Sequence, residues 1–240
     1  MPGDAPRVEF LPGFMQHADS WSEVAAAVGQ RYPSEVLDFA TWTFEERLGE
    51  ISAAAPPGSV LVGYSMGGRL ALHAALRDPG RYRALALVGA SPGIADDGAR
   101  ERRRVADEEL AAWIEAHSIE EVVARWEANP VFSLQPAEVV AAQRAGRLRH
   151  EPSDLATLLR SAGQGALDPV WDRLGELSMP VLAVAGAHDS MYVETGGRMA
   201  RLGRRVTAAA IADAGHAAHL EQPAAVRDVI RPFIERFVAL

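Results

Sequence analysis

The chain has no cysteine among its 240 residues. This absence excludes disulfide bonds, thiol nucleophiles and cysteine-ligated metal sites, and it is typical of a reducing compartment. No stretch approaches the ~20 consecutive apolar residues that a membrane helix needs. The first residues also lack the basic segment and the apolar run of a secretory signal. We therefore expect a cytoplasmic protein that has no membrane partner.

A surplus of positive charge is also missing. Acidic side chains outnumber Lys and Arg by 32 to 24, so the formal net charge is −8. Nucleic-acid-binding proteins usually carry a basic face, so we expect no nucleic-acid partner. Neither glycine-rich phosphate-loop pattern, G-x-x-x-x-G-K-[ST] or G-x-G-x-x-G, occurs, and no cluster of metal-ligand residues stands out. We expect no cofactor and no metal, in a monomer or homodimer.

Short apolar runs alternate with segments of helical spacing, and the length suits one α/β domain. The expected strands are Val8–Leu11, Glu35–Asp38, Val60–Gly63, Ala84–Val88, Pro180–Ala185 and Val206–Ile211. The expected helices are Trp21–Gly29, Phe44–Ala54, Gly67–Arg77, Thr195–Leu202 and Pro223–Phe237. Continuous apolar strands that alternate with helices predict a mostly parallel central sheet with helices on both faces.

The middle of the chain, residues 96–177, has no convincing strand. Its apolar residues, such as Leu110 and Ile114, follow helical spacing, and Pro130, Pro136 and Pro152 divide it into several helices. We predict a helical cap inserted into a core made of residues 1–95 and 178–240. Such a cap would cover the carboxyl edge of the sheet, where open α/β sheets bind ligands.

A G-x-S-x-G motif, made of Gly63, Ser65 and Gly67, lies between an apolar run and a helix-compatible run. In the nucleophile elbow of α/β-hydrolases, a serine occupies a strained strand-to-helix turn, so the neighbouring positions must be small. The following helix directs its N–H dipoles at developing negative charge. A plain glycine-rich turn is the alternative. The strand before the motif and the helix after it favour Ser65 as a nucleophile.

A serine nucleophile needs a general base, and a carboxylate usually orients that base. In this fold the chain order is Ser, then Asp or Glu, then His. Asp189 and His216 each follow an apolar strand, so both are expected at the same sheet edge as the serine. Gly215 frees the loop before His216. His219 and Asp213 remain alternatives for the base and the orienting carboxylate.

The first predicted strand ends in Phe-Leu-Pro-Gly-Phe-Met (10–15). In this fold, a loop after an early strand and the residue after the nucleophile each supply one backbone N–H to an oxyanion hole. The candidates are Phe14 and Met66. A simple turn at Pro12-Gly13 is the alternative.

Several strings together resemble one enzyme family. They are Gly-Tyr-Ser-Met-Gly-Gly-Arg-Leu-Ala-Leu (63–72), Ser-Pro-Gly-Ile (91–94), Arg-Trp-Glu-Ala-Asn-Pro-Val-Phe (125–132), Ala-Gly-Ala-His-Asp-Ser (185–190) and Ala-Gly-His-Ala-Ala-His-Leu-Glu-Gln-Pro (214–223). The chain resembles the 2-succinyl-6-hydroxy-2,4-cyclohexadiene-1-carboxylate synthases of menaquinone biosynthesis, which have the α/β-hydrolase fold. The resemblance implies a lyase that eliminates pyruvate from an enolpyruvoyl cyclohexene dicarboxylate. Its Ser-His-Asp set would remove a carbon-bound proton, and its partner would be a small anionic substrate.

The same resemblance implies substrate-binding roles for Tyr64, Arg69, Arg103 and Trp126, because arginine forms bidentate contacts with carboxylates. Arg103 stands in a charged run (100–104) that could equally be a solvated helix face. Trp126 could equally be part of the cap core.

A second cap arginine is expected at Arg144, with Arg147 as the competing position. The family usually has His-Gly where this chain has Pro12-Gly13, and an Asp-x-Pro-Gly-His-Gly-like loop where this chain has Leu-Asp-Phe-Ala-Thr-Trp-Thr-Phe (37–44). The alternative function is a serine hydrolase, acting on an ester, a lactone or a carbon–carbon bond with the same triad. A ligand-binding protein that has lost catalysis is a third possibility.

Overall fold

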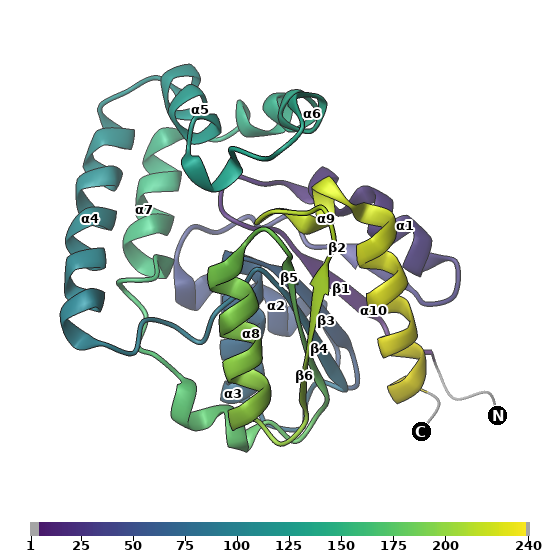
Figure 1. The fold of residues 1–240 in the computed structure, drawn as a ribbon. Helices are drawn as coiled ribbons and strands as arrows, with labels where there is room; N and C mark the ends of the chain where they lie inside the picture. Colours follow the sequence, from purple (N-terminus) through teal and green to yellow (C-terminus); the bar gives the residue numbers. More distant parts are fainter. Residues whose placement is uncertain (1–4, 239–240) are drawn as a thin grey trace.

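The computed structural model describes residues 5–238 (Figure 1). Residues 1–4, part of the segment inspected for a secretory signal, lie outside this range. Within it, six strands form one sheet in the order β2-β1-β3-β4-β5-β6, and all neighbours are parallel. The strands are β1 (Val8–Leu11), β2 (Ser34–Val36), β3 (Val60–Tyr64), β4 (Ala84–Val88), β5 (Val181–Gly186) and β6 (Val206–Ile211). This sheet confirms the predicted fold class.

Alternate residues of the central strands face two separate apolar cores. In β3, Leu61 packs with one core and Val60 with the other, as expected for a period of two. The core around Leu61 includes residues of α2 (Phe44–Ala54), α3 (Met66–Arg77) and α8 (Ser190–Leu202). The core around Val60 includes residues of α1 (Ser22–Gly29) and α10 (Pro223–Val238). Helices therefore cover both faces of the sheet (Figure 1).

The chain between β4 and β5 is helical. It contains α4 (Asp97–Glu115), α5 (Ile119–Glu127), η2 (Pro130–Phe132), α6 (Ala137–Arg147), α7 (Pro152–Ala162) and η3 (Trp171–Glu176). In Figure 1, α4 and α7 lie side by side, and α5 and α6 lie beyond the edge of the sheet that is close to α9 (Ala218–Glu221). One further short helix, η1 (Ala18–Trp21), follows β1.

Two predicted elements differ from the structure by more than one residue at an end. The ladder between β2 and β1 ends at Val36, so this edge strand is shorter than predicted. Helix α8 begins at Ser190 and not at Thr195, because the Asp189 side chain accepts a hydrogen bond from the backbone N–H of Tyr192 at 3.4 Å and caps the helix. In the described part of the chain, none of the helices has the length and hydropathy of a transmembrane span.

Candidate active site

Ser65 occupies the sharp turn between β3 and α3. Its backbone has φ 49° and ψ −107°, a region that costs a non-glycine residue about 1–3 kcal/mol. A Cβ atom on Gly67 would lie 2.2 Å from the carbonyl oxygen of Leu11, so the turn packs directly against the end of β1. These two observations explain why the motif needs small residues beside the serine.

The structure brings Ser65, His216 and Asp189 together. The distance from His216 Nε2 to Ser65 Oγ is 3.3 Å, and that from His216 Nδ1 to Asp189 Oδ2 is 2.7 Å. The side chains of His216 and Asp189 are only 8% and 10% exposed, so their hydrogen bond forms away from most solvent. This arrangement can pass a proton from the serine hydroxyl to an imidazole whose orientation a carboxylate fixes.

The loop that carries His216 is itself held by a carboxylate. Glu221, on α9, accepts hydrogen bonds from the backbone N–H groups of Gly215 and Ala217, one on each side of the histidine. His219 instead packs between Trp21 and Tyr64, with ring centroids 4.3 Å and 4.2 Å away. Burial lowers the pKa of His219 to about 3, with a further contribution from His216.

The alternative base, His219, and the alternative carboxylate, Asp213, are therefore not hydrogen-bonded to Ser65 or His216 in the described part of the chain. The ring of His219 is buried in a different contact set, and its Nε2 lies 3.5 Å from Gln16 Nε2. Asp213 is an exposed loop residue with φ 54°. Among residues 5–238, His216 is the only histidine in hydrogen-bond contact with Ser65, and Asp189 is the only carboxylate in hydrogen-bond contact with His216.

The two residues predicted to supply N–H groups to an oxyanion hole line one cavity beside Ser65. Phe14 and Met66 both line it, and neither N–H has a hydrogen-bond partner within the described residues. A side-chain hydrogen bond stabilises the loop that carries Phe14, since Gln16 Oε1 accepts from the backbone N–H of Gly13 at 3.0 Å. A Cβ atom on Gly13 would lie 2.7 Å from the Tyr64 ring, so glycine lets that ring pack against the loop.

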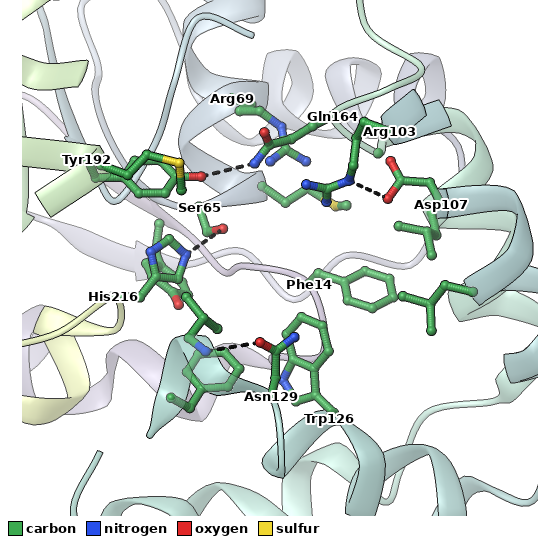
Figure 2. Close-up of a pocket in the computed structure, with 18 residues that line it drawn as sticks. Phe14, Ser65, Arg69, Arg103, Asp107, Trp126, Asn129, Gln164, Tyr192 and His216 are labelled. Carbon is green, nitrogen blue, oxygen red and sulfur yellow. Dashed lines mark hydrogen bonds and ion pairs between the residues drawn. The ribbon is translucent and has the colours of Figure 1, made fainter. Parts of the chain in front are cut away.

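A cavity of about 270 Å³ opens beside Ser65 and has two chemically different walls (Figure 2). The polar wall consists of Arg69, Arg103, Asp107, Gln164 and Tyr192. The apolar wall consists chiefly of Phe14, Trp126 and Phe132, whose rings touch in sequence at centroid distances of 5.3 and 5.4 Å. The remaining lining residues are Tyr64, Ser65, Met66, Leu110, Asn129, Val131, Leu159, Gly163, Met191 and His216.

Arg69 places a positive charge in this polar wall. It is 6% exposed, its Nη2 donates to the carbonyl oxygen of Ala162 at 2.8 Å, and its buried Nε has no partner among the described residues. Burial lowers the pKa of Arg69 to about 10, so the guanidinium remains charged at neutral pH. A buried cation with an unused donor is suited to an anionic ligand.

Arg103 is the second arginine of the wall. Its Nε donates to Asp107 Oδ1 at 2.7 Å, and Figure 2 shows its guanidinium projecting toward the cavity between Asp107 and Gln164. Asp107 Oδ2 also accepts from Gly165 N at 3.2 Å, which fixes the carboxylate. The wall thus carries two arginines and one carboxylate.

Arg144 and Arg147, the two positions predicted for a second cap arginine, both pair with Glu127. Arg144 does not line the cavity. Its side chain is 45% exposed and pairs with Glu127, which neutralises its charge. Arg147 is buried, pairs with Glu127 at 3.1 Å, and is also absent from the lining. The two arginines stand three residues apart on one face of α6, and no residue of α6 is among those that line the cavity.

Sequence reasoning placed Tyr64, Arg69, Arg103 and Trp126 at this site, and all four line the cavity. It missed Asp107, Gln164 and Tyr192. Two signals were available: Asp107 stands four residues after Arg103 on one helix, and Tyr192 follows Asp189 by three residues. Gln164 gave no such signal, because it lies in a non-helical link between cap and core.

No group of three or more His, Cys, Asp or Glu side chains within residues 5–238 is arranged to hold a metal ion. The groups that the site does present are a serine, a histidine, two carboxylates, two arginines and the free backbone N–H groups of Phe14 and Met66.

Comparison with known proteins connects this site to a family. The chain matches the family model described as alpha/beta hydrolase fold over residues 28–223. A putative 2-succinyl-6-hydroxy-2,4-cyclohexadiene-1-carboxylate synthase of Bacillus subtilis (strain 168) is 35% identical over 177 residues, which make up 72% of this chain. That alignment spans 65% of the B. subtilis protein, slightly less than two thirds of its length.

Two further relatives align over almost their whole length. The 2-succinyl-6-hydroxy-2,4-cyclohexadiene-1-carboxylate synthase of Serratia proteamaculans (strain 568) is 27% identical over 245 residues, covering 96% of this chain and 94% of that protein. The solved structure of MenH from S. aureus superimposes with a TM-score of 0.89 at 27% identity, covering 96% and 94% of the two chains. These similarities confirm the resemblance seen in the motifs. The chain belongs to the alpha/beta hydrolase fold family.

Proposed function

We propose that this protein is a lyase of menaquinone biosynthesis that eliminates pyruvate from an enolpyruvoyl cyclohexene dicarboxylate and leaves 2-succinyl-6-hydroxy-2,4-cyclohexadiene-1-carboxylate. The observation that carries the proposal is the pairing of the Ser65–His216–Asp189 set with a polar wall that contains the buried Arg69 and the partly exposed Arg103. The named synthases of B. subtilis and S. proteamaculans support it. The expected cytoplasmic location stays a prediction.

The reaction follows from what these groups can do. His216 Nε2 takes the proton of Ser65 Oγ, and the serine oxygen then removes a proton from a ring carbon of the substrate. The electron pair of the broken C–H bond forms a ring double bond and expels the enolpyruvoyl oxygen, so the C–O bond breaks. The departing enolate takes up the proton held by His216 and becomes pyruvate, which restores the neutral imidazole, and no water is consumed. Asp189 stabilises the imidazolium throughout.

The two-walled cavity suits such a substrate. A cyclic dicarboxylate has an apolar ring face and a charged edge. The rings of Phe14, Trp126 and Phe132 can pack on the former, and the arginines of the opposite wall can bind the latter. Because Asp107 offsets one of the two arginines, the wall keeps one net positive charge. The N–H groups of Phe14 and Met66 would stabilise the charge that develops when the ring proton leaves.

A serine hydrolase is the competing function, since the same Ser-His-Asp geometry serves acyl transfer. A neutral ester does not need a buried, charged arginine beside the serine. The desolvation of Arg69 is costly unless an anion compensates it, which favours the lyase.

The test offers the purified protein the enolpyruvoyl substrate and, separately, p-nitrophenyl acetate. We expect pyruvate release by the wild-type protein and its loss in Ser65→Ala. Ester turnover without pyruvate release would replace the lyase by a hydrolase. If neither compound is turned over, the ligand-binding alternative is favoured. Full activity in Ser65→Ala would exclude any mechanism that depends on this serine.

A further inference from the structure

The hydroxyl of Tyr192 lies on the polar wall, and the reaction described above does not use it. Tyr192 is the third residue of α8 and is 6% exposed. Its ring packs against the imidazole of His216 with 4.8 Å between centroids, and its hydroxyl reaches the cavity lining (Figure 2). The ring thus shields the histidine while the hydroxyl extends past it.

The hydrogen-bond pattern leaves the hydroxyl proton of Tyr192 free. Gln164 Nε2 donates to the Tyr192 oxygen at 3.0 Å, and an amide nitrogen can only donate. The tyrosine O–H must therefore find its own acceptor, yet no oxygen within residues 5–238 accepts from it. Because buried hydroxyl groups are nearly always paired, this donor is suited to an acceptor on a molecule in the cavity.

Gln164 is held in place by a short link, residues 162–165, which comprises the last residue of α7 and the three residues after it. Arg69 Nη2 donates to the carbonyl oxygen of Ala162 at 2.8 Å, and Asp107 Oδ2 accepts from Gly165 N at 3.2 Å. One short link therefore contacts Arg69, Asp107 and, through Gln164, the hydroxyl of Tyr192. This link fixes the polar wall as a unit, which limits the directions in which the hydroxyl can point.

The chemistry of the missing acceptor follows from its neighbours. Arg69 and Tyr192 line the same wall of the cavity, and Figure 2 shows both beside Gln164, so one ligand can contact both groups. An acceptor placed between a cation and a free O–H donor is best satisfied by an anionic oxygen. A carboxylate supplies two such oxygens.

We propose that Tyr192 binds a carboxylate oxygen of the substrate by donating its hydroxyl proton beside Arg69, and that Gln164 is a positioning residue that orients this hydroxyl. The inference deepens the proposed function, on which it rests for the anionic substrate. The carboxylate bound here is not the reacting centre, so the contact contributes to binding and not to the chemical step.

The test replaces Tyr192 by Phe, which keeps the ring packed on His216 and removes only the hydroxyl. The probes are phthalate, a cyclic dicarboxylate, and its uncharged dimethyl ester, both followed by calorimetry. We expect Tyr192→Phe to weaken phthalate binding about tenfold or more, the usual effect of losing a hydrogen bond to a charged group, and to leave dimethyl phthalate within about twofold. Tyr32→Phe, which alters a tyrosine of the core around Val60, is the matched control and should change neither.

Steady-state kinetics supply a second readout. Tyr192→Phe should raise KM for the enolpyruvoyl substrate by the same factor and leave kcat within about threefold, because uniform binding is lost. A structural role would instead lower kcat by disturbing His216. An unchanged KM and unchanged phthalate binding in Tyr192→Phe would overturn the inference, as would wild-type protein that binds phthalate no better than its dimethyl ester.

The positioning role of Gln164 is tested by a double-mutant cycle. Gln164→Met should weaken phthalate binding, and the double variant with Tyr192→Phe should bind no worse than Tyr192→Phe alone. Additive losses would place Gln164 on the ligand and overturn its positioning role. Selective phthalate binding that depends on Tyr192 without any pyruvate release would contradict the proposed function only. Pyruvate release with an unchanged KM in Tyr192→Phe would contradict this inference only.

Discussion

Asp189→Asn isolates the carboxylate that orients His216. The two side chains share a 2.7 Å hydrogen bond, and Asp189 Oδ1 also accepts from the backbone N–H of Tyr192. In the variant, the backbone N–H of Tyr192 needs an acceptor and therefore bonds to the amide oxygen of the asparagine. The amide NH₂ then takes the place of Oδ2 and faces the imidazole. The imidazole must then accept at Nδ1 and hold its proton at Nε2, where it can no longer receive the proton of Ser65. The base is present but in the wrong tautomer.

The expected cost combines two losses. A hydrogen bond between a charged carboxylate and imidazolium contributes about 1.5–3 kcal/mol, and the tautomer must also be reversed before each turnover. In serine-triad enzymes the corresponding change lowers kcat by roughly 10⁴. We therefore expect kcat for pyruvate release to fall by about 10³–10⁴, which equals about 4–5.5 kcal/mol of barrier. Thermal unfolding should change little, because asparagine caps a helix about as well as aspartate.

The assay couples pyruvate release to lactate dehydrogenase and follows NADH, with far-UV circular dichroism as the folding check. Asp213→Asn is the matched control, because Asp213 is the exposed carboxylate on the loop before His216, and it should keep activity within about twofold. Residual activity above a tenth of wild type in Asp189→Asn, or a large loss in Asp213→Asn, would refute this role of Asp189.

Further predictions concern packing, charge and pH. Gly67→Ala should lower the free energy of unfolding by about 1–3 kcal/mol or more, since its Cβ would overlap the end of β1. Gly49→Ala, on α2 where a Cβ meets no neighbour, should raise the free energy of unfolding by about 0.5–1 kcal/mol; urea unfolding measures both changes. Arg69→Met should weaken phthalate binding about tenfold or more, and Arg144→Met, outside the cavity, should leave it unchanged by calorimetry. Burial, aided by nearby positive charges, lowers the pKa of His150 to about 3. Between pH 6.5 and pH 3, His150 is therefore protonated in the unfolded chain and neutral in the folded chain. Stability should therefore fall as pH drops from 6.5 toward 3, and His150→Phe should reduce that slope by about 1.4 kcal/mol per pH unit in urea titrations at several pH values.

Most of the fold was readable from the sequence because parallel strands are continuous apolar runs. Val60–Tyr64 and Ala84–Val88 are fully buried and stand out for that reason. The edge strand β2 was placed less well, since only one side of it pairs and its burial is partial. The early start of α8 was missed because the same aspartate caps the helix and contacts His216.

The site was only partly readable for a different reason. Ser65, Asp189 and His216 follow strand ends, so the topology alone brings them to one edge. The arginines come from helices, and helical spacing alone could not show that Arg144 and Arg147 both pair with Glu127 instead of lining the cavity. Gln164 lies in a link whose path depends on packing between α4 and α7, which no local pattern encodes.

The pyruvate yield in a single-turnover reaction tests the proposed lyase most directly. Enzyme in excess over the enolpyruvoyl substrate is followed by proton NMR. The proposed mechanism predicts one pyruvate per substrate consumed in the wild-type protein and in Ser91→Ala, whose serine lies outside the cavity, and none in Ser65→Ala. Substrate consumed without pyruvate, or equal pyruvate yields and rates from Ser65→Ala and wild type, would contradict it.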